Sequence, residues 1–415
     1  MPAEIELSSL DSHHLRLDVP AHPMNWVLVL ELSPDGEPVR IEDVRARIAQ
    51  RFGESDLYRL VLPTHPRRKP RFTLATSIDP TEHAKEYHVA DRFGMLRQVE
   101  ELMGSRMRRD VPPWDFTLVH QQDTTSQALL LRVHHGLSDG LGAPGFVAMV
   151  SDTASGSTAE YQRFVSTPRF DVGPVGVVAA VAAGARSSRL LRRQGWRPKH
   201  LRPDGDRAVR RVAEIAVPTE TVRQNRLKLG ASTQEYVYAA AGLAFARAFP
   251  EHADRPLRIM FPVSLDQTLA HTGNAASLAI LELSDAADSL SKQVHSIRTA
   301  LLSSDPSRQA IDAPKTSHGL SYLPWRAQVL MTQLMAADSW DLAVGVNPAF
   351  SPDNRLLGRE VTNVVGFHPM LGRELAVTAL ILRDQVTIGM MADPAALPDV
   401  GLFAEHLREL IAGQV

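Results

Sequence analysis

Two adjacent histidines and an aspartate occur within the stretch LLLRVHHGLSDGLGAPG, residues 129–145. An imidazole can accept and return a proton near neutral pH, because its ordinary pKa is about 6.5. His135 shares a strand face with apolar residues, which would disfavour the charged imidazolium and keep the ring neutral. The stretch therefore predicts a general base. Asp139 either holds the loop by pairing with an arginine or orients an imidazole, and we favour the arginine pair.

The two histidines end a run, ALLLRVH from residue 128, that is typical of a β-strand. Successive side chains of a strand point to opposite faces, so His134 and His135 should play different parts. Neighbouring histidines on a strand cannot both aim at one ion, and no glutamate follows at the spacing of a metalloprotease helix. We therefore expect no metal at this motif.

The glycines of GLGAPG match the G-x-G-x-x-G pattern of dinucleotide-binding folds. That pattern requires a strand that leads directly into the first glycine. Here residues 135–139 separate the strand from Gly140, and Pro144 and Gly145 fit a turn that opens a helix at FVAMV. We interpret the dinucleotide match as accidental, which leaves H-H-x-x-x-D-G as the motif that carries chemistry.

Strand-like and helix-like segments alternate irregularly on both sides of the motif. Helical periodicity occurs in IEDVRARIAQRF, MLRQVEELMGSRM, STQEYVYAAAGLAFARAF and VGLFAEHLRELIAG, which begin at residues 41, 95, 232 and 400. Strand-like runs begin at residues 25, 58, 116, 128, 258, 277, 342, 374 and 386. Such interleaving predicts an α/β fold of mixed sheets with helices on their faces.

The composition changes between about residues 153 and 211. A turn-rich segment is followed by the small-residue run VGPVGVVAAVAAGA, which predicts a helix, and then by a dense basic cluster with two prolines. We interpret this segment as a solvated linker rather than a patch for anionic lipid or nucleotide phosphates. The predicted organisation is an N-terminal lobe at 1–155, a basic connector at 156–210 and a C-terminal lobe at 211–415.

The composition excludes several classes of site. The 415 residues carry 45 Lys and Arg against 47 Asp and Glu, so no overall charge draws the chain to nucleic acid or to an anionic membrane. The absence of cysteine excludes disulfides, thiolate metal sites and a cysteine nucleophile. The first residues lack the pattern of a secretory signal, and no apolar run is long enough to span a bilayer. We expect a cytoplasmic protein with at most peripheral membrane contact.

The H-H-x-x-x-D-G motif at a strand end resembles that of the superfamily of chloramphenicol acetyltransferase, peptide-synthetase condensation domains and coenzyme A-dependent acyltransferases. Within that superfamily, six further elements resemble, in order, those of the bacterial wax ester synthase/diacylglycerol acyltransferase family. They are LSSLDSHHLRLDVPAHPMNWVLVLEL, VPPWDFTLV with Pro112, Trp114 and Asp115, LGASTQEYVYAAAGLAFARAF, PLRIMFPVS, the pair Gly273 and Asn274, and ADPAALPDVGLFAEHLREL. The resemblance covers nearly the whole chain.

This resemblance implies two chloramphenicol acetyltransferase-like lobes that form a pseudo-dimer around a central tunnel, with the motif midway along it. It also implies acyl transfer from a thioester to a hydroxyl acceptor, with acyl-CoA as co-substrate, no bound cofactor and no metal. His134, His135 and Asp139 would form the catalytic motif, with His135 as general base. Asp139 would brace the loop, Gly140 would allow the turn, and no covalent acyl-enzyme would be needed.

The tetrahedral intermediate of acyl transfer carries a negative charge that requires hydrogen-bond donors. Ser264 and Asn274 are the candidates for contacts to this oxyanion or to substrate. We nevertheless favour structural roles for both, because each also fits the end of a strand or a turn.

The chain departs from the family pattern at positions that leave its substrates open. Gln234 and Glu235 replace the usual Asn-Asp pair, Asp266 replaces an arginine, and Val346 stands where asparagine is usual. The acceptor is therefore a long-chain alcohol, a diacylglycerol or a specialised molecule. Two further alternatives are a donor carried by an acidic acyl carrier protein, which would meet the basic stretch 186–211, and a relative that binds lipid or a partner without catalysis.

Overall fold

β2 (Asn25–Leu32) shows how the sequence builds the sheet that carries the histidine motif. Its even-numbered residues Trp26, Leu28, Leu30 and Leu32 pack into one hydrophobic cluster, and its odd-numbered Val27 and Val29 pack into another. Both faces of this strand are therefore covered, which explains its almost unbroken apolar run. The computed structural model describes residues 5–122, 124–152, 169, 173, 175–193, 208–252, 255–266, 273–283, 288–336, 339–348, 355–370 and 375–414.

Six of the described strands form the first sheet. β7, which ends at His134, pairs antiparallel with β2 and with β6, and only the edge pair β5 and β6 is parallel. The order across this sheet is β12 (Arg355–Leu356), β13 (Arg359–Phe367), β2, β7 (Gln127–His134), β6 (Trp114–Gln121) and β5 (Ala84–Val89).

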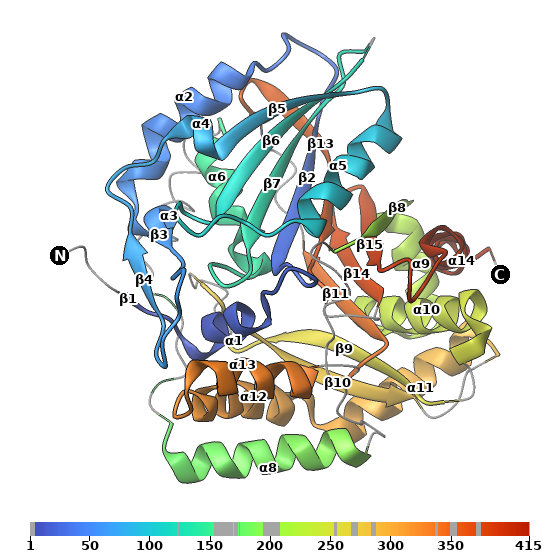
Figure 1. The fold of residues 1–415 in the computed structure, drawn as a ribbon. Helices are drawn as coiled ribbons and strands as arrows, with labels where there is room; N and C mark the ends of the chain where they lie inside the picture. Colours follow the sequence, from blue (N-terminus) through green and yellow to red (C-terminus); the bar gives the residue numbers. More distant parts are fainter. Residues whose placement is uncertain are drawn as a thin grey trace.

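A second sheet of six described strands lies beside the first (Figure 1). Its central strand β11 is parallel to both of its neighbours, whereas the outer pairs are antiparallel. The order is β10 (Ala276–Leu283), β9 (Leu257–Ser264), β11 (Leu342–Pro348), β14 (Leu375–Ile381), β15 (Gln385–Ala392) and β8 (Arg211–Pro218). A small third sheet joins β1 (Ile5–Glu6), β4 (Arg71–Leu74) and β3 (Leu60–Val61).

The two large sheets do not follow the expected boundary between lobes. β12 and β13 come from the C-terminal half of the chain, yet β13 pairs with β2 and completes the first sheet. β13 also packs against β14 and β15 of the second sheet. Gly389 on β15 permits this approach, because a Cβ there would overlap the carbonyl oxygen of Gly366 on β13. The C-terminal half therefore supplies strands to both large sheets, and the division at 155 and 211 stays a prediction.

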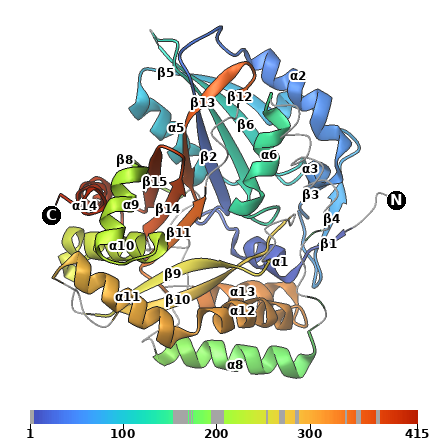
Figure 2. The same cartoon turned by 180° about the vertical axis from the view of Figure 1, so that it is seen from behind.

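Helices cover the outer faces of both sheets (Figures 1 and 2). On the first sheet, α2 (Ile41–Arg51) and α6 (Ala143–Val150) share a core with the even-numbered face of β2, and α5 (Arg92–Gly104) covers its odd-numbered face. On the second sheet, the covering helices are α9 (Thr219–Lys228), α10 (Thr233–Ala248), α11 (Leu290–Ser304) and α14 (Val400–Ala412). The shorter helical segments are α3 (Asp56–Arg59), α4 (Pro80–His83) and the 3-10 turns Phe52–Glu54, Gly140–Gly142 and Pro250–His252.

A layer of helices lies below α1 in Figure 1. α1 (Ser9–Leu17) packs against α12 (Pro306–Leu320) and α13 (Trp325–Ala336), and α12 in turn packs against α8 (Val177–Arg193). α1 begins with a capping box in which Ser8 and Asp11 each accept a hydrogen bond from the backbone amide of the other. This box fixes the start of the helix and the place of Asp11.

The fold class predicted from the sequence is confirmed: mixed sheets with flanking helices form an α/β protein. Ser232 is the N-cap of α10, as expected, with Glu235 completing its capping box. Two local predictions are wrong. The run YRLVL yields only the two-residue strand β3 because α3 occupies the preceding residues, and α6 begins at Ala143 rather than after Gly145.

The predicted connector lies mostly outside the described residues, apart from a few positions and the helix α8. α8 confirms the expected small-residue helix and extends it to Arg193. None of the described helices is long and apolar enough to cross a membrane.

Candidate active site

His135 lies directly after β7, at the point where the two large sheets meet. Its backbone amide donates to the carbonyl of Met24 at 2.6 Å, which fixes the end of the strand. Its ring Nδ1 lies 3.0 Å from Oδ1 of Asn274, a residue of the segment just before β10. The motif of the first sheet and the start of a strand of the second sheet therefore meet at this imidazole.

The hydrogen bonds of Asn274 determine which nitrogen of His135 carries the proton. The Nδ2 group of Asn274 donates to Oδ1 of Asp11 at 2.8 Å and to the carbonyl of His135 at 2.7 Å. Both partners can only accept, so the amide cannot be turned round, and Oδ1 must face the imidazole. Nδ1 of His135 therefore donates, and Nε2 keeps the lone pair that a general base requires.

His135 is surrounded by other imidazoles. The ring of His14 on α1 stacks on it, with centroids 3.7 Å apart and planes inclined by 20°, and His13 meets His14 edge-on. Burial lowers the pKa of His135, against the opposing effect of the Asp139 charge, and lowers the pKa of His13 to about 3. Burial likewise lowers the pKa of His368 to about 4.

These histidines are nevertheless not fully buried: His13, His14, His135 and His368 all keep some accessible surface. His135 is thus neither sealed within a packed core nor fully exposed to solvent, and desolvation favours its neutral form.

His134 plays a different part from His135, as the alternation of the strand predicted. Its Nδ1 accepts a hydrogen bond from the amide of Gly136 at 2.9 Å, and its ring is almost completely buried. Its Nε2 faces Oδ2 of Asp18 at 3.5 Å, and that carboxylate also pairs with Arg106 and Arg109. His134 therefore holds the turn after β7 and does not face the site.

Asp139 ties the motif to the second sheet. Its Oδ2 accepts hydrogen bonds from the amides of Ala275 and Ala276, both at 2.9 Å, and its Oδ1 accepts from Gly142 at 3.2 Å. Through these backbone amides the buried carboxylate holds the loop, and the pairing of Asp139 with an arginine stays a prediction. The loop and β10 are thereby fixed to one another.

Gly140 is not the glycine that the turn requires. Its backbone is not left-handed, and a Cβ there would meet open space. At Gly142 a Cβ would instead overlap Oγ of Ser138, which donates to the carbonyl of Asp139. The tight position is therefore Gly142, at the end of the 3-10 turn that precedes α6.

Ser264 and Asn274, the expected oxyanion or substrate contacts, have their hydrogens engaged elsewhere. Ser264 ends β9 and donates to the carbonyl of Asp266 at 2.8 Å. Asn274 lies at the imidazole itself, as its orienting partner. Asp11, His14 and His368 were not identified from the sequence. The signal for the first two was the segment LSSLDSHH, whose likeness to a family opening pointed to importance without assigning a role.

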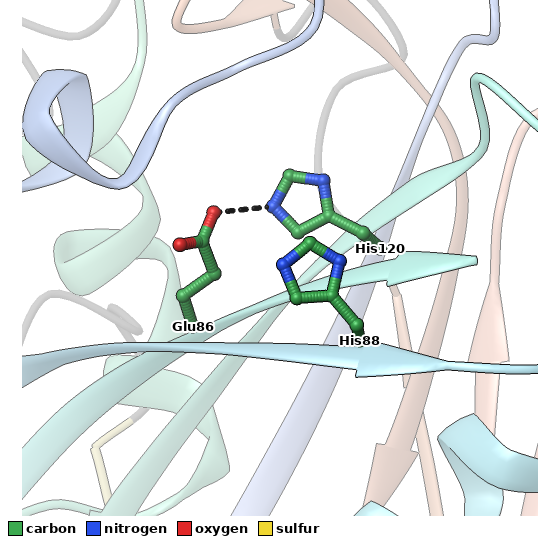
Figure 3. Close-up of side chains that lie close together, drawn as sticks. All are labelled: Glu86, His88 and His120. Atoms are coloured by element: carbon green, nitrogen blue, oxygen red, sulfur yellow. Dashed lines mark ion pairs between the residues drawn. The ribbon is translucent and has the colours of Figure 1, made fainter. Parts of the chain in front are cut away.

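Glu86 and His88 on β5 and His120 on β6 bring three metal-capable side chains together, at the end of β6 that is far from the motif (Figure 3). The hydrogen bonds of His120 argue against ligation. Gln127 is locked by both backbone groups of Val39, so its Nε2 must donate to Nδ1 of His120 at 3.2 Å. Nε2 of His120 then carries the hydrogen and lies 2.7 Å from Oε1 of Glu86. The arrangement favours a histidine–glutamate pair over a metal centre.

With this geometry established, comparison with known proteins identifies the family. Residues 7–237 match the wax ester synthase/diacylglycerol acyltransferase catalytic domain. The chain belongs to this family. The matched range includes α1, the whole H-H-x-x-x-D-G motif and the start of α10. The chain is accordingly an O-acyltransferase that forms esters, as the resemblance implied.

Two relatives from Mycobacterium tuberculosis illustrate the distance within the family. A probable diacylglycerol O-acyltransferase, tgs1, of strain CDC 1551 / Oshkosh is 22% identical over 347 residues, which cover 77% of this chain and 74% of the relative. A putative diacylglycerol O-acyltransferase, Rv0221, of strain ATCC 25618 / H37Rv is also 22% identical and covers 92% of this chain and 90% of the relative.

Solved structures share the fold over nearly the whole chain. The wax ester synthase/diacylglycerol acyltransferase from Marinobacter aquaeolei VT8 superposes with a TM-score of 0.68 at 16% identity, covering 98% of each chain. TRI3 trichothecene 15-O-acetyltransferase from Fusarium sporotrichioides gives 0.68 at 12% identity, covering 99% of this chain and 95% of that one. The first condensation domain of the CDA synthetase gives 0.58 at 16% identity, covering 99% and 96%. The two-lobed acyltransferase architecture of the family is therefore the fold of this chain.

Proposed function

We propose that the acyl donor is acyl-CoA, that the acceptor is an alcohol, and that Nε2 of His135 is the general base. The observation that carries this proposal is the contact of Asn274 with His135. Because Oδ1 of Asn274 accepts from Nδ1 at 3.0 Å, the opposite nitrogen is free to take a proton. The depressed pKa of His135 keeps that nitrogen unprotonated at neutral pH.

The proposed reaction needs no covalent enzyme intermediate. Nε2 of His135 takes the hydroxyl proton as the acceptor oxygen bonds to the thioester carbonyl carbon. The resulting tetrahedral intermediate collapses with cleavage of the carbon–sulfur bond, and the imidazolium returns the proton to the departing thiolate. Ester and free thiol are the products, so atoms and charge balance without a further reactant. The burial of His135 limits the water that competes with the alcohol as the nucleophile.

In this proposal the residues around His135 hold the imidazole and its loop in position. Asp11 and Asn274 orient the imidazole, and Asp139 holds the loop against β10 through backbone amides. His134 stabilises the turn that follows β7. None of these four residues needs to gain or lose a proton during the reaction.

A carrier-protein donor receives less support from the described part of the basic segment. Three of its arginines are engaged within the chain: Arg186 pairs with Asp312 at 2.6 Å, Arg210 donates to the carbonyl of Ala21 at 2.9 Å, and Arg211 pairs with Glu100 at 3.1 Å. Arg189 and Arg192 are exposed. An acidic carrier would have to compete with these internal partners. This favours the coenzyme A thioester as the donor.

The test is turnover of the His135→Ala variant. The chain has no cysteine, so a thiol reagent reports only the coenzyme A that is released. We expect kcat/KM to fall by roughly 10²–10⁴-fold, since that is the usual contribution of a general base. Unchanged circular dichroism and thermal midpoint would show that the fold persists. Near-normal turnover in this variant would reject the assignment.

A further inference from the structure

A cavity of about 240 Å³ lies between α8, α12, α13 and β10, below α1. Its apolar wall comes from each of these elements and from Trp340, which lies between α13 and β11. The residues of the four elements are Leu190, Leu278, Ile280, Ala313, Leu320, Met335 and Ala336. Ion-paired Arg186 and Asp312 border the same cavity, and the arginine is partly exposed to solvent.

The polar residues of this wall offer few free hydrogen-bonding groups. The hydroxyls of Thr316 and Thr332 donate to carbonyls one turn earlier in their own helices, both at 2.8 Å. Ser317 donates to the carbonyl of Ser9 at 2.6 Å, and Ser339 donates to that of Met335 at 2.6 Å. Gln309 bonds both backbone groups of Ile280. Oγ of Ser304 and Nε1 of Trp340, both in lining residues, are buried without a hydrogen-bond partner. A ligand here would therefore meet a few such groups and mainly methyl and methylene groups.

Two routes of contacts run from His135, which is not a lining residue, to the cavity. His13 lines it and contacts His14, which stacks on His135. Along β10, the wall residue Leu278 follows Ala276 by two positions, on the same face of the strand, and the amide of Ala276 is bonded to Asp139. Along both routes, only a few residues separate the apolar wall from the motif.

We propose that this cavity holds the hydrocarbon part of one substrate and limits its length. The inference rests on the acyl transfer proposed above. It further specifies the length of the hydrocarbon chain in the acyl group or in the acceptor. A cavity of about 150 Å³ is known to hold benzene, so by proportion about 240 Å³ holds an apolar group of roughly ten carbons. The same chemistry could belong to the acyl donor or to the alcohol, and the experiment separates the two.

The diagnostic variant is Ala313→Leu, which adds bulk to the wall within α12 without disturbing its helix propensity. The matched control is Ala327→Leu on α13, a position of similar exposure that does not line the cavity. Both variants and the parent chain are assayed with an acyl-CoA series from butanoyl to hexadecanoyl at one acceptor. They are then assayed with an alcohol series from butanol to hexadecanol at one donor.

We expect kcat/KM of the parent chain to peak near decanoyl or decanol in one series. Ala313→Leu should lower kcat/KM for that ten-carbon substrate by about 10–100-fold and leave the butanoyl or butanol substrate within about twofold. The series in which this occurs identifies the occupant. The control should keep the parent profile. An unchanged length profile for Ala313→Leu in both series would overturn the proposal.

Binding separates failure of the cavity proposal from failure of the proposed reaction. The His135→Ala variant is titrated calorimetrically with decanoyl-CoA and with decanol, with and without Ala313→Leu. Loss of at least tenfold in affinity for one ligand on adding Ala313→Leu supports the cavity even if transfer is absent, in which case the proposed reaction falls alone. Equal affinities with and without Ala313→Leu, or no binding of either ligand, would refute the cavity proposal.

Discussion

Oδ1 of Asn274 accepts a hydrogen bond from Nδ1 of His135 although the two residues lie 139 positions apart in the chain. The same amide donates to Asp11 of α1 and to the carbonyl of His135. Three segments thus converge on one imidazole: the first helix, the end of β7 and the start of β10. The tautomer of the base is a product of tertiary structure.

Removing this amide should slow the reaction without unfolding the chain. We expect Asn274→Ala to lower kcat by roughly 10–100-fold, the usual effect of losing a partner that orients a functional histidine. The hydrogen bond from Nδ1 also stabilises the protonated ring, so its loss should lower the pKa of His135 further. The acidic limb of the pH profile should therefore move to lower pH. Ser264→Ala is the control, with an expected change below about twofold, and a pH profile identical to the parent would contradict the orienting role.

The pH dependence of kcat/KM should report a depressed histidine. Burial lowers the pKa of His135, and the base works only when neutral. Activity should therefore be retained below the ordinary imidazole pKa of about 6.5 and be lost only as the pH falls through the lowered value. Initial rates measured across that range give the midpoint. A midpoint at or above about 6.5 would be inconsistent with the buried neutral ring.

The buried imidazoles of His13 and His368 should make the fold sensitive to acid. Burial lowers the pKa of His13 to about 3 and that of His368 to about 4, so both rings are neutral in the folded chain at pH 5 but protonated once it unfolds. Each such group lowers the free energy of unfolding by about 1.4 kcal/mol per pH unit as the pH falls below about 6.5. Urea unfolding at several pH values measures this slope. His368→Gln should reduce it, and an unchanged slope would show that His368 is protonated in the folded state.

Asp139 should matter for stability as well as for the site. Asp139→Asn replaces one acceptor oxygen with a donor that faces backbone amides, and it removes the charge that strengthens the remaining hydrogen bonds. We expect a loss of about 1–3 kcal/mol in the free energy of unfolding. The exposed Asp288→Asn, whose partner is Lys292, should change it by less than about 0.5 kcal/mol. Equal effects of the two substitutions would contradict a structural role for Asp139.

Two glycines in the motif loop should respond differently to substitution by alanine. Gly142→Ala places a methyl group against Oγ of Ser138 and should cost about 1 kcal/mol, because the hydroxyl must give up its hydrogen bond to Asp139. Gly140→Ala meets open space and should be close to neutral. Thermal unfolding of both variants tests the contrast. Ser138→Ala combined with Gly142→Ala should recover most of the loss, and additive losses would mean that the clash lies elsewhere.

Local patterns predicted what local forces determine. Alternating or continuous apolar runs located β2, β6, β7, β9 and β14, and the serine at 232 marked the start of α10. The strand β13 was not predicted, because REVTNVVGF has mixed polarity and its pairing with β2 is determined by tertiary contacts. The same distinction between local and tertiary contacts applies to the candidate site. His135 was evident from its neighbours, whereas the contact of Asn274 with His135 was not predicted because the two residues are distant in sequence.

The pairing of β13 with β2 has a consequence for biosynthesis. The sheet that positions His135 includes a strand that ends only at Phe367. A ribosome must therefore polymerise the chain through Phe367 before that sheet can be complete. If synthesis stopped earlier, the edge of β2 would stay unpaired and could pair with other nascent chains. The truncated chain would also lack a complete sheet behind its histidine motif.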